Sequence, residues 1–222
     1  MKIVKAKIKP ITRINGNKML LEIANIARTC YKTPKSNDIE AAKRTVQRLI
    51  QSGHTSMLEF VHITMKYVSN IAAYKDLTRQ RLTTFAIEST RYANYSKDKF
   101  GNELTFINPI EIKDKTSKEY EIWKQTMKIL EQSYMDLAKL GKKPDVLSLI
   151  LPHSTKAEFN ISANLREWRH IFKLRSSIAA TGTPRPCVAE IMDPTLELFY
   201  SKIPVIFDDL FEIYKQKKQQ IH

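Results

Sequence analysis

The segment from Arg79 to Tyr92, RQRLTTFAIESTRY, sets the expectations for the rest of this chain. It holds three arginines and a single glutamate, and no helix or strand period sorts its side chains onto a polar and an apolar face. A solvated run of charges is the ordinary interpretation of such a cluster. Planar guanidinium groups, however, suit bidentate binding of phosphate or of a heterocycle edge, and one carboxylate cannot neutralise three of them. The segment therefore predicts an anion site, most simply for a nucleotide.

Length and composition are those of a globular protein: 222 residues, of which 42% are hydrophobic and 27% charged. No repeat or linker interrupts the chain, so we expect one domain, residues 1–222. No apolar run approaches the roughly 20 residues of a membrane span, and the N-terminus lacks the apolar block of a secretory signal. Two distant cysteines, Cys30 and Cys187, favour a reducing compartment over a disulfide scaffold. The expected location is the cytoplasm, with no membrane partner.

The net charge of +14 favours anionic partners. Much of it comes from lysines scattered over amphipathic stretches, which is more typical of a soluble surface than of a stripe that binds nucleic acid. We therefore expect a small anionic ligand, with nucleic acid as the less favoured partner. The common metal-binding and phosphate-loop motifs are missing from the sequence, so no metal site is expected.

The spacing of apolar residues predicts the secondary structure. Strands are expected at residues 1–10, 61–67, 103–107 and 156–163. Helices are expected from residue 17 to 27, 39 to 50, 70 to 78 and 164 to 175, with a short helical turn at 145–150. A capping box at Thr116 and Glu119 predicts a helix ending near Gly141. A helix over 188–192 is expected to give way to a new one at Asp193-Pro194, and Pro204 to start the last helix.

Three separate segments together resemble the flavin-dependent thymidylate synthases. The first is an Arg-x-Arg pair followed by seven residues and a serine, here Arg79, Arg81 and Ser89. The second is the run Gly53-His54-Thr55-Ser56-Met57-Leu58-Glu59, ahead of a strand. The third is a helix that begins Asn164-Leu165-Arg166 and ends at Arg175. The resemblance covers most of residues 53–192 in the same order, which makes it more specific than any one motif.

The resemblance implies both a fold and a reaction. The fold is α+β, an antiparallel sheet flanked by helices, and the assembly is typically a homotetramer with sites shared between subunits. The enzyme is a methyltransferase that makes thymidylate from dUMP, a pyrimidine deoxynucleotide monophosphate. Methylenetetrahydrofolate, the folate cosubstrate, supplies the carbon, and FAD, reduced by NADPH, supplies the hydride. An arginine that faces the N3–C2=O edge activates the pyrimidine, because a guanidinium placed in advance stabilises charge where it forms.

The roles of individual residues are also what the resemblance implies. Arg175 is the catalytic arginine. The cofactor would be bound by Ser56, Arg79, Gln80, Arg81, Asn164, Arg166 and His170. The nucleotide would be bound by Asp76, Arg79, Glu88, Ser89, Thr90, Arg91 and Arg175, with residues 88–91 coming from a neighbouring subunit.

Departures from the family pattern fall at these contacts. Gln80 stands where the family has histidine, Asp76 where it has glutamine, and Ser148 where it has an arginine that binds the nucleotide. Ile87 and His170 differ as well, and Arg185 on the long loop could replace the missing arginine. An acid near the pyrimidine would favour a base with donors, so dCMP or another altered pyrimidine nucleotide is an alternative substrate. Two further alternatives are a flavin-binding relative without turnover and a basic nucleic-acid-binding module without catalysis.

Overall fold

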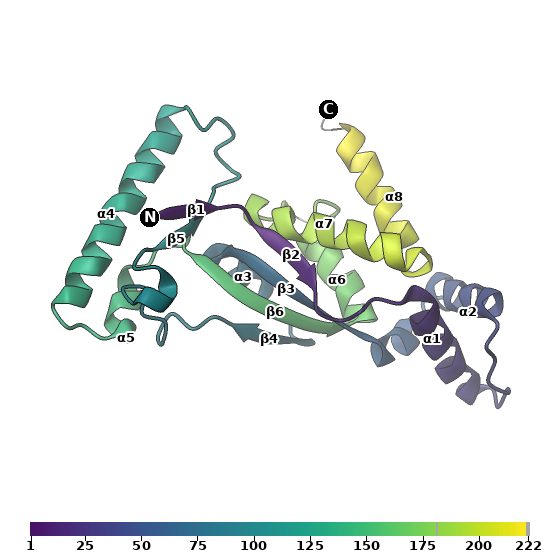
Figure 1. The fold of residues 1–222 in the computed structure, drawn as a ribbon. Helices are drawn as coiled ribbons and strands as arrows, with labels where there is room; N and C mark the ends of the chain where they lie inside the picture. The colour runs from purple at the N-terminus through teal and green to yellow at the C-terminus, as the bar shows by residue number, and fades with distance from the viewer. Residues whose placement is uncertain (181, 221–222) are drawn as a thin grey trace.

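A four-stranded antiparallel sheet forms the centre of the computed structural model, which describes residues 1–180 and 182–220 (Figure 1). The strands lie in the order β2 (Lys7–Pro10), β3 (His62–Asn70), β6 (Lys156–Asn164) and β4 (Thr83–Ile87). The two long strands pair along their whole length, with His62 opposite Asn164 and Asn70 opposite Lys156. This arrangement, with helices around the sheet, confirms the expected α+β class.

The two faces of the sheet differ because side chains alternate along each strand. On one face of β3, Ile63, Met65 and Tyr67 are fully buried, and Phe159 and Ile161 continue that face on β6. The opposite face carries polar side chains that stay partly exposed, among them Lys66, Glu158, Asn160 and Ser162. The alternation in the sequence therefore leaves one side of the sheet open to water or to a ligand.

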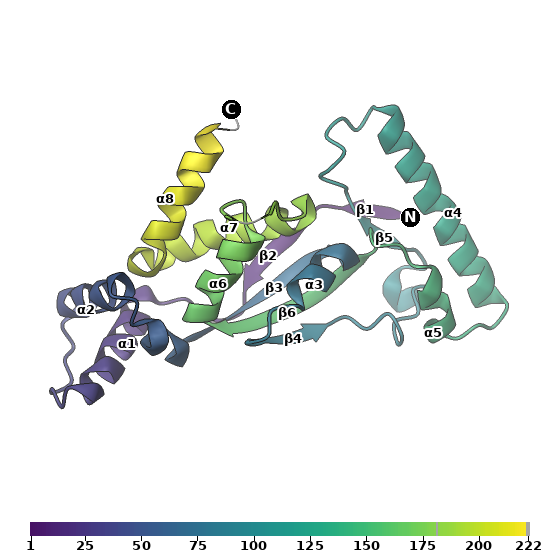
Figure 2. The ribbon, with the colours of Figure 1, turned by 180° about the vertical axis from the view of Figure 1, so that it is seen from behind.

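Helices cover the apolar face (Figure 2). They are α3 (Ile71–Leu77), α6 (Leu165–Arg175) and α7 (Pro186–Lys202), and α8 (Pro204–Gln220) packs on α7 and α6. Four aromatic rings fill the contact between α6, α7 and α8, namely Trp168, Phe172, Phe199 and Phe207, with ring centroids 5.2 to 5.8 Å apart. The Trp168 indole also donates a hydrogen bond to the Ile63 carbonyl at 3.0 Å. This core fixes α6 against the sheet.

Two helices pack together at one end of the sheet (Figure 1). They are α1 (Gly16–Cys30) and α2 (Ile39–Gln51), followed by the 3-10 helix η1 (Thr55–Phe60). Asp38 caps α2 by accepting from the backbone N–H of Glu40 and Ala41, and Gly53 adopts a left-handed φ of 75° just after the helix, as expected. Gly16 is required for another reason, since a Cβ there would lie 2.1 Å from the Lys202 carbonyl oxygen.

The other end of the sheet carries a second apolar cluster. Strand β1 (Lys2–Val4) pairs in parallel with β5 (Thr105–Ile107), and the long helix α4 (Lys118–Lys139) packs beside them. The short elements η2 (Asp98–Phe100), α5 (Pro144–Leu147) and η3 (Ser148–Ile150) complete this end. Its buried residues include Leu104, Phe106, Met127, Tyr134 and Leu147. The chain therefore has two apolar clusters, and its division into domains stays a prediction.

Four local expectations were wrong. Residues 1–10 form two strands in different sheets, β1 and β2. Helix α4 is capped by Ser117, which accepts from Tyr120 N, and Thr116 instead donates to Asp114. Helix α7 continues through Pro194 without a restart. Residues 83–87, for which no strand period was expected, form β4.

In the described part of the chain, no helix is both long and apolar enough to cross a bilayer.

Candidate functional site

Strand β4 separates the predicted site residues into two groups. Its first residue, Thr83, pairs with Ala163, so Gln80 and Arg81 approach the β6–α6 junction. Its last residue, Ile87, pairs with Phe159, and Glu88 then donates its backbone N–H to the Glu158 carbonyl at 2.8 Å. At about 3.4 Å per residue, the strand separates the two groups by roughly 17 Å. We call them the arginine end and the glutamate end.

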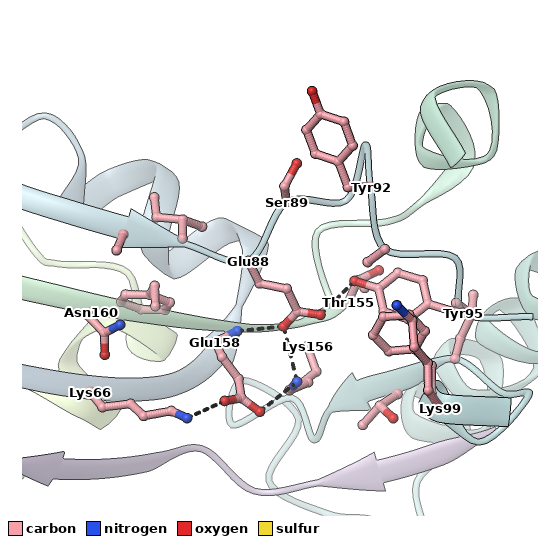
Figure 3. A pocket seen from close by; sticks show the side chains of 17 residues that line it. Lys66, Glu88, Ser89, Tyr92, Tyr95, Lys99, Thr155, Lys156, Glu158 and Asn160 are labelled. Carbon is pink, nitrogen blue, oxygen red and sulfur yellow. Dashed lines mark hydrogen bonds and ion pairs between the residues drawn. The ribbon is translucent and has the colours of Figure 1, made fainter. Parts of the chain in front are cut away.

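The glutamate end opens onto a cavity of about 860 Å³ on the polar face of the sheet (Figure 3). Glu88 and Ser89 line it from the end of β4, and Lys156, Glu158 and Asn160 line it from β6. The remaining polar lining comes from Lys66, Tyr92, Tyr95, Lys99, Thr105 and Thr155. The volume is in the range of small-molecule sites. Three lysines and two glutamates give the cavity a net positive charge, which suits an anionic ligand.

The Glu88 carboxylate organises this cavity (Figure 3). One oxygen accepts from the Tyr95 hydroxyl at 2.9 Å. The other accepts from the Lys156 ammonium at 3.1 Å and from the Glu158 backbone N–H at 3.0 Å. The Glu158 carboxylate in turn pairs with Lys156 at 3.0 Å and with Lys66 at 2.6 Å. Both oxygens of Glu88 are therefore already engaged by the protein.

These contacts determine the charges in the cavity at neutral pH. Burial lowers the pKa of Lys156, but its bonds to Glu158 and Glu88 outweigh burial and leave that pKa raised. Hydrogen bonds from Lys66 and Lys156 lower the pKa of Glu158. Burial, and then the neighbouring charge of Glu88, raise the pKa of Tyr95. Lys156 thus stays charged, Glu158 stays ionised, and the Tyr95 phenol keeps its proton and donates a hydrogen bond to Glu88.

The arginine end contains residues predicted to contact the flavin. Arg166 on α6 pairs with Glu59 at the end of η1, at 2.5 Å. Ser56 lies on the same 3-10 helix and His170 one turn further along α6, and both are exposed. The Asn164 side chain accepts from Glu167 N at 2.8 Å and so caps α6. Exposed polar groups from η1 and α6 are therefore held together by one ion pair.

Arg175, the last residue of α6, has an unusual environment. Its Nε is buried and has no hydrogen-bond partner among the residues described. A buried donor without an acceptor costs about 1–3 kcal/mol, so such a group is uncommon in a protein without a ligand. The Asn160 Oδ1 atom in the large cavity also lacks a partner in the described part of the chain. Both atoms are therefore unsatisfied polar atoms of the described part of the chain.

The remaining predicted residues lie in different places: Gln80 and its neighbours precede β4, Asp76 is on α3, and Ser148 begins η3 next to α5. Gln80 is buried, whereas Arg79 and Arg81 on either side of it are exposed. Asp76 on α3 pairs with Arg185 at 3.3 Å, so the acid already has a basic partner. Ser148 donates to the Asp145 carbonyl at 2.7 Å within a helical turn. In the loop of residues 181–186, Thr181 lies outside the described residues.

One copy of the chain does not bring all the predicted residues into one cavity. The large cavity contains Glu88 and Ser89, but its lining includes neither the Arg79–Arg81 segment nor Arg175. Thr90 and the exposed Arg91 follow in the turn after Ser89. The residue roles therefore stay predictions.

Most of the polar lining of this cavity was not predicted from the sequence, including the four residues that form the network of contacts around Glu88, namely Lys66, Tyr95, Lys156 and Glu158. Three of them lie on the polar side of two clearly alternating strands, so the pattern itself marked the face. It did not show that this face is hollow.

The fold and the two charged ends of β4 place the chain among α+β proteins with an open, cationic sheet face. Residues 16–204 match the sequence model of the family described as thymidylate synthase complementing protein, and the chain belongs to that family.

Its relatives include enzymes named flavin-dependent thymidylate synthase. The protein from Pyrococcus furiosus is 30% identical over 147 residues, 65% of this chain and 57% of that protein. The protein from Pyrococcus abyssi is 30% identical over 135 residues, 60% of this chain and 54% of that protein. The one from Corynebacterium glutamicum is 28% identical over 227 residues, with 94% and 85% covered. The chain thus spans little more than half the length of the two Pyrococcus proteins.

Among solved structures, the chain is similar to PolB from Streptomyces cacaoi, described as a UMP/dUMP methylase bound with 5-Br dUMP. The TM-score is 0.77 at 18% identity, with 94% of this chain and 96% of PolB covered. At this identity the likeness establishes the fold, and it agrees with the family match.

Proposed function

We propose that this protein is a flavin-dependent thymidylate synthase-like methyltransferase. It would transfer a one-carbon unit from methylenetetrahydrofolate to C5 of dUMP, giving dTMP, with FAD as cofactor and NADPH as reductant. Family membership supports the reaction class. The observation that carries the proposal is the buried Arg175 Nε without an acceptor, at the end of a helix whose exposed face holds Arg166 and His170. A basic protein that only bound nucleic acid at its surface would not need such a group.

The residues at the arginine end fit a flavin nucleotide. Its pyrophosphate requires cations and donors, and Arg79 and Arg81 are exposed without a carboxylate within 4 Å in the described part of the chain. Arg166 keeps guanidinium donors free beyond its single contact with Glu59. In this proposal the cofactor is held by Ser56, Arg79, Gln80, Arg81, Asn164, Arg166 and His170. When bound, the flavin would supply the hydride.

Arg175 is the proposed catalytic residue, through electrostatics. Attack by C5 of a pyrimidine requires electron density at C5, which rises as negative charge develops at N3 and the C2 oxygen. A guanidinium already in position stabilises that charge without reorganisation of solvent. Arg175 is held at the end of α6 by the aromatic core behind it, which keeps the group in place. Neither cysteine is needed, and burial raises the pKa of the Cys187 thiol to about 11, which disfavours a thiolate.

The nucleotide would be bound by residues from both ends, Asp76, Arg79, Glu88, Ser89, Thr90, Arg91 and Arg175. Because β4 separates the ends by roughly 17 Å within one copy, we propose that a second copy supplies residues 88–91. Exposed apolar side chains on α4 support an assembly, since Ile122 and Ile129 lie seven residues apart on one helix face and are 55% and 66% exposed. The proposed assembly is a homotetramer in the cytoplasm, and light scattering on the purified protein measures its mass.

The Asp76–Arg185 ion pair favours dUMP over dCMP. An unpaired acid beside the base would favour the amino group of cytosine, but here a guanidinium at 3.3 Å balances that charge. PolB is described as acting on UMP as well as dUMP. The substrate test therefore supplies dUMP, UMP and dCMP separately, each with methylenetetrahydrofolate, NADPH and FAD. We expect a methylated product from dUMP, and product from dCMP alone would overturn the substrate assignment.

The flavin test is simpler. The purified protein should be yellow, and the Arg175→Ala variant should keep its flavin absorption while it loses activity, because Arg175 is proposed to act on the pyrimidine and not to hold the cofactor. A colourless protein that gives no product from any nucleotide, and that binds nucleic acid with a steep dependence on salt, would instead indicate a basic nucleic-acid-binding module.

A further inference from the structure

A second cavity, of about 480 Å³, lies between the C-terminal ends of α1 and α2. These helices are at the opposite end of the sheet from α4 (Figure 1). The cavity has an apolar part, formed by Ala27 and Leu49, and a basic part, formed by Arg28 and Arg48 from the last turns of the two helices. Tyr31 adds an aromatic ring that is 70% exposed. Its lining thus combines apolar surface with two guanidinium groups.

Neither arginine forms a close ion pair within the described part of the chain, although the pKa of the nearby Asp38 carboxylate is lowered, first by a backbone hydrogen bond and also by the charge of Arg28. No acidic residue lines the cavity, and among the residues described neither arginine has a carboxylate within 4 Å. Each makes a single bond to a backbone carbonyl, Arg28 to Pro34 at 3.0 Å and Arg48 to Arg44 at 3.4 Å. A guanidinium has five N–H donors and suits carboxylate or phosphate, so most of the donor capacity remains available. The lining fits an anion attached to a planar apolar body.

The cavity is connected to the proposed flavin site through η1. His54, which lines the cavity, directly precedes η1, and Glu59 near the other end of η1 pairs with Arg166. At about 2 Å per residue in a 3-10 helix, His54 and Glu59 are roughly 10 Å apart along the chain. A cosubstrate whose reactive ring lies beside Ser56 and Arg166 therefore has its tail within reach of the cavity.

We propose that the α1–α2 cavity binds the aminobenzoyl-glutamate tail of the folate cosubstrate. This tail is a planar ring that carries carboxylates, and the ring would lie against Leu49 and Tyr31 while the carboxylates face Arg28 and Arg48. The proposal rests on the proposed function, which supplies the folate. It adds a site at which added γ-glutamyl groups strengthen binding, since each adds a carboxylate beside the arginines.

The test measures binding of the tail alone, which requires neither flavin nor turnover. Purified protein is titrated by calorimetry with p-aminobenzoyl-glutamate and with its γ-diglutamate. We expect Arg28→Gln and Arg48→Gln each to weaken binding about five-fold and the double variant about 25-fold, the upper range for exposed charge pairs. Arg48→Lys, which keeps the charge, should retain most of the affinity, and the diglutamate should bind wild type more tightly.

Arg44→Gln is the matched control, because Arg44 is exposed on the same helix, does not line the cavity and changes the net charge equally. Equal fragment affinity in the double variant and in Arg44→Gln would overturn the proposal, as would no measurable fragment binding. A third titration uses 2′,5′-ADP, which carries an adenine and phosphates. If the double variant weakens binding of 2′,5′-ADP but not of the fragment, the proposal is overturned in favour of a dinucleotide. If wild type makes no thymidylate but binds the fragment through these arginines, the proposed function alone fails.

Discussion

Replacement of Glu88 by alanine tests whether its carboxylate holds the end of β4 to β6. The substitution removes the acceptor for the Tyr95 hydroxyl, the Glu158 N–H and Lys156. The first two donors are left in a partly buried place without a partner, at about 1–1.5 kcal/mol each. Lys156 keeps its pair with Glu158 at 3.0 Å and adds about 0.5 kcal/mol. The expected loss in the free energy of unfolding is about 3 kcal/mol.

Urea denaturation at pH 7, followed by circular dichroism, measures this loss. Ser89→Ala is the matched control, because the neighbouring hydroxyl is exposed and its removal should change stability by less than about 0.5 kcal/mol. Tyr95→Phe combined with Glu88→Ala should cost less than the sum of the single changes, since both remove the same 2.9 Å bond. A loss below about 1 kcal/mol for Glu88→Ala, or strict additivity with Tyr95→Phe, would refute the reasoning.

Three further changes test the helix that carries the arginine end. Asp209→Asn should cost about 2 kcal/mol at pH 7, because the buried Arg169 loses its charged partner and keeps at most one of the two bonds of 2.7 and 2.6 Å. Burial alone would raise the pKa of Asp209, but the bond to Arg169 and its charge outweigh burial and leave that pKa lowered. The stability from this ion pair is therefore present above the ordinary pKa near 4 and is lost as the pH falls through the lowered pKa. Urea denaturation of the wild type at pH 7 and pH 3 measures this loss. Burial raises the pKa of Glu167, so the folded protein favours the protonated carboxyl and is destabilised once that carboxyl ionises at higher pH. Glu167→Gln, which cannot ionise, should therefore stabilise the protein at pH 7 and have no effect below about pH 4 in the same assay. Arg175→Lys should lower kcat about 100-fold with flavin content unchanged, and equal rates would contradict its electrostatic role.

Much of the fold could be predicted because its pattern is local. Ile63, Met65 and Tyr67 alternate with polar residues, and Phe159 and Ile161 do the same on the partner strand, so both central strands were predicted correctly. The periodicity of each segment does not predict that the two strands pair with one another, because the pairing joins residues about 100 positions apart in the chain. The predicted class was right because a whole family pattern, and not a single strand, implied it.

The errors have physical reasons. Pro194 favours a helix start, and inside α7 it removes the backbone bond to Glu190 and crowds that carbonyl, but the buried neighbours Ile191 and Leu196 keep the helix packed. Thr83–Ile87 is an edge strand whose alternating Phe85 and Ile87 are only half-buried, so its period was masked by the arginines around it. The Asp76–Arg185 pair joins α3 to the start of α7, a contact that no spacing in the sequence indicates.

Because β4 holds the two charged ends apart, damage at one end leaves the other intact. Subunits with Arg175→Ala and subunits with Ser89→Ala would each be inactive alone when every site needs both ends. When the two variants are refolded together into mixed assemblies, some interfaces would join the unmodified arginine end of a Ser89→Ala subunit to the unmodified glutamate end of an Arg175→Ala subunit. Part of the activity would then return on mixing, which could not happen if one copy supplied both ends of its own site.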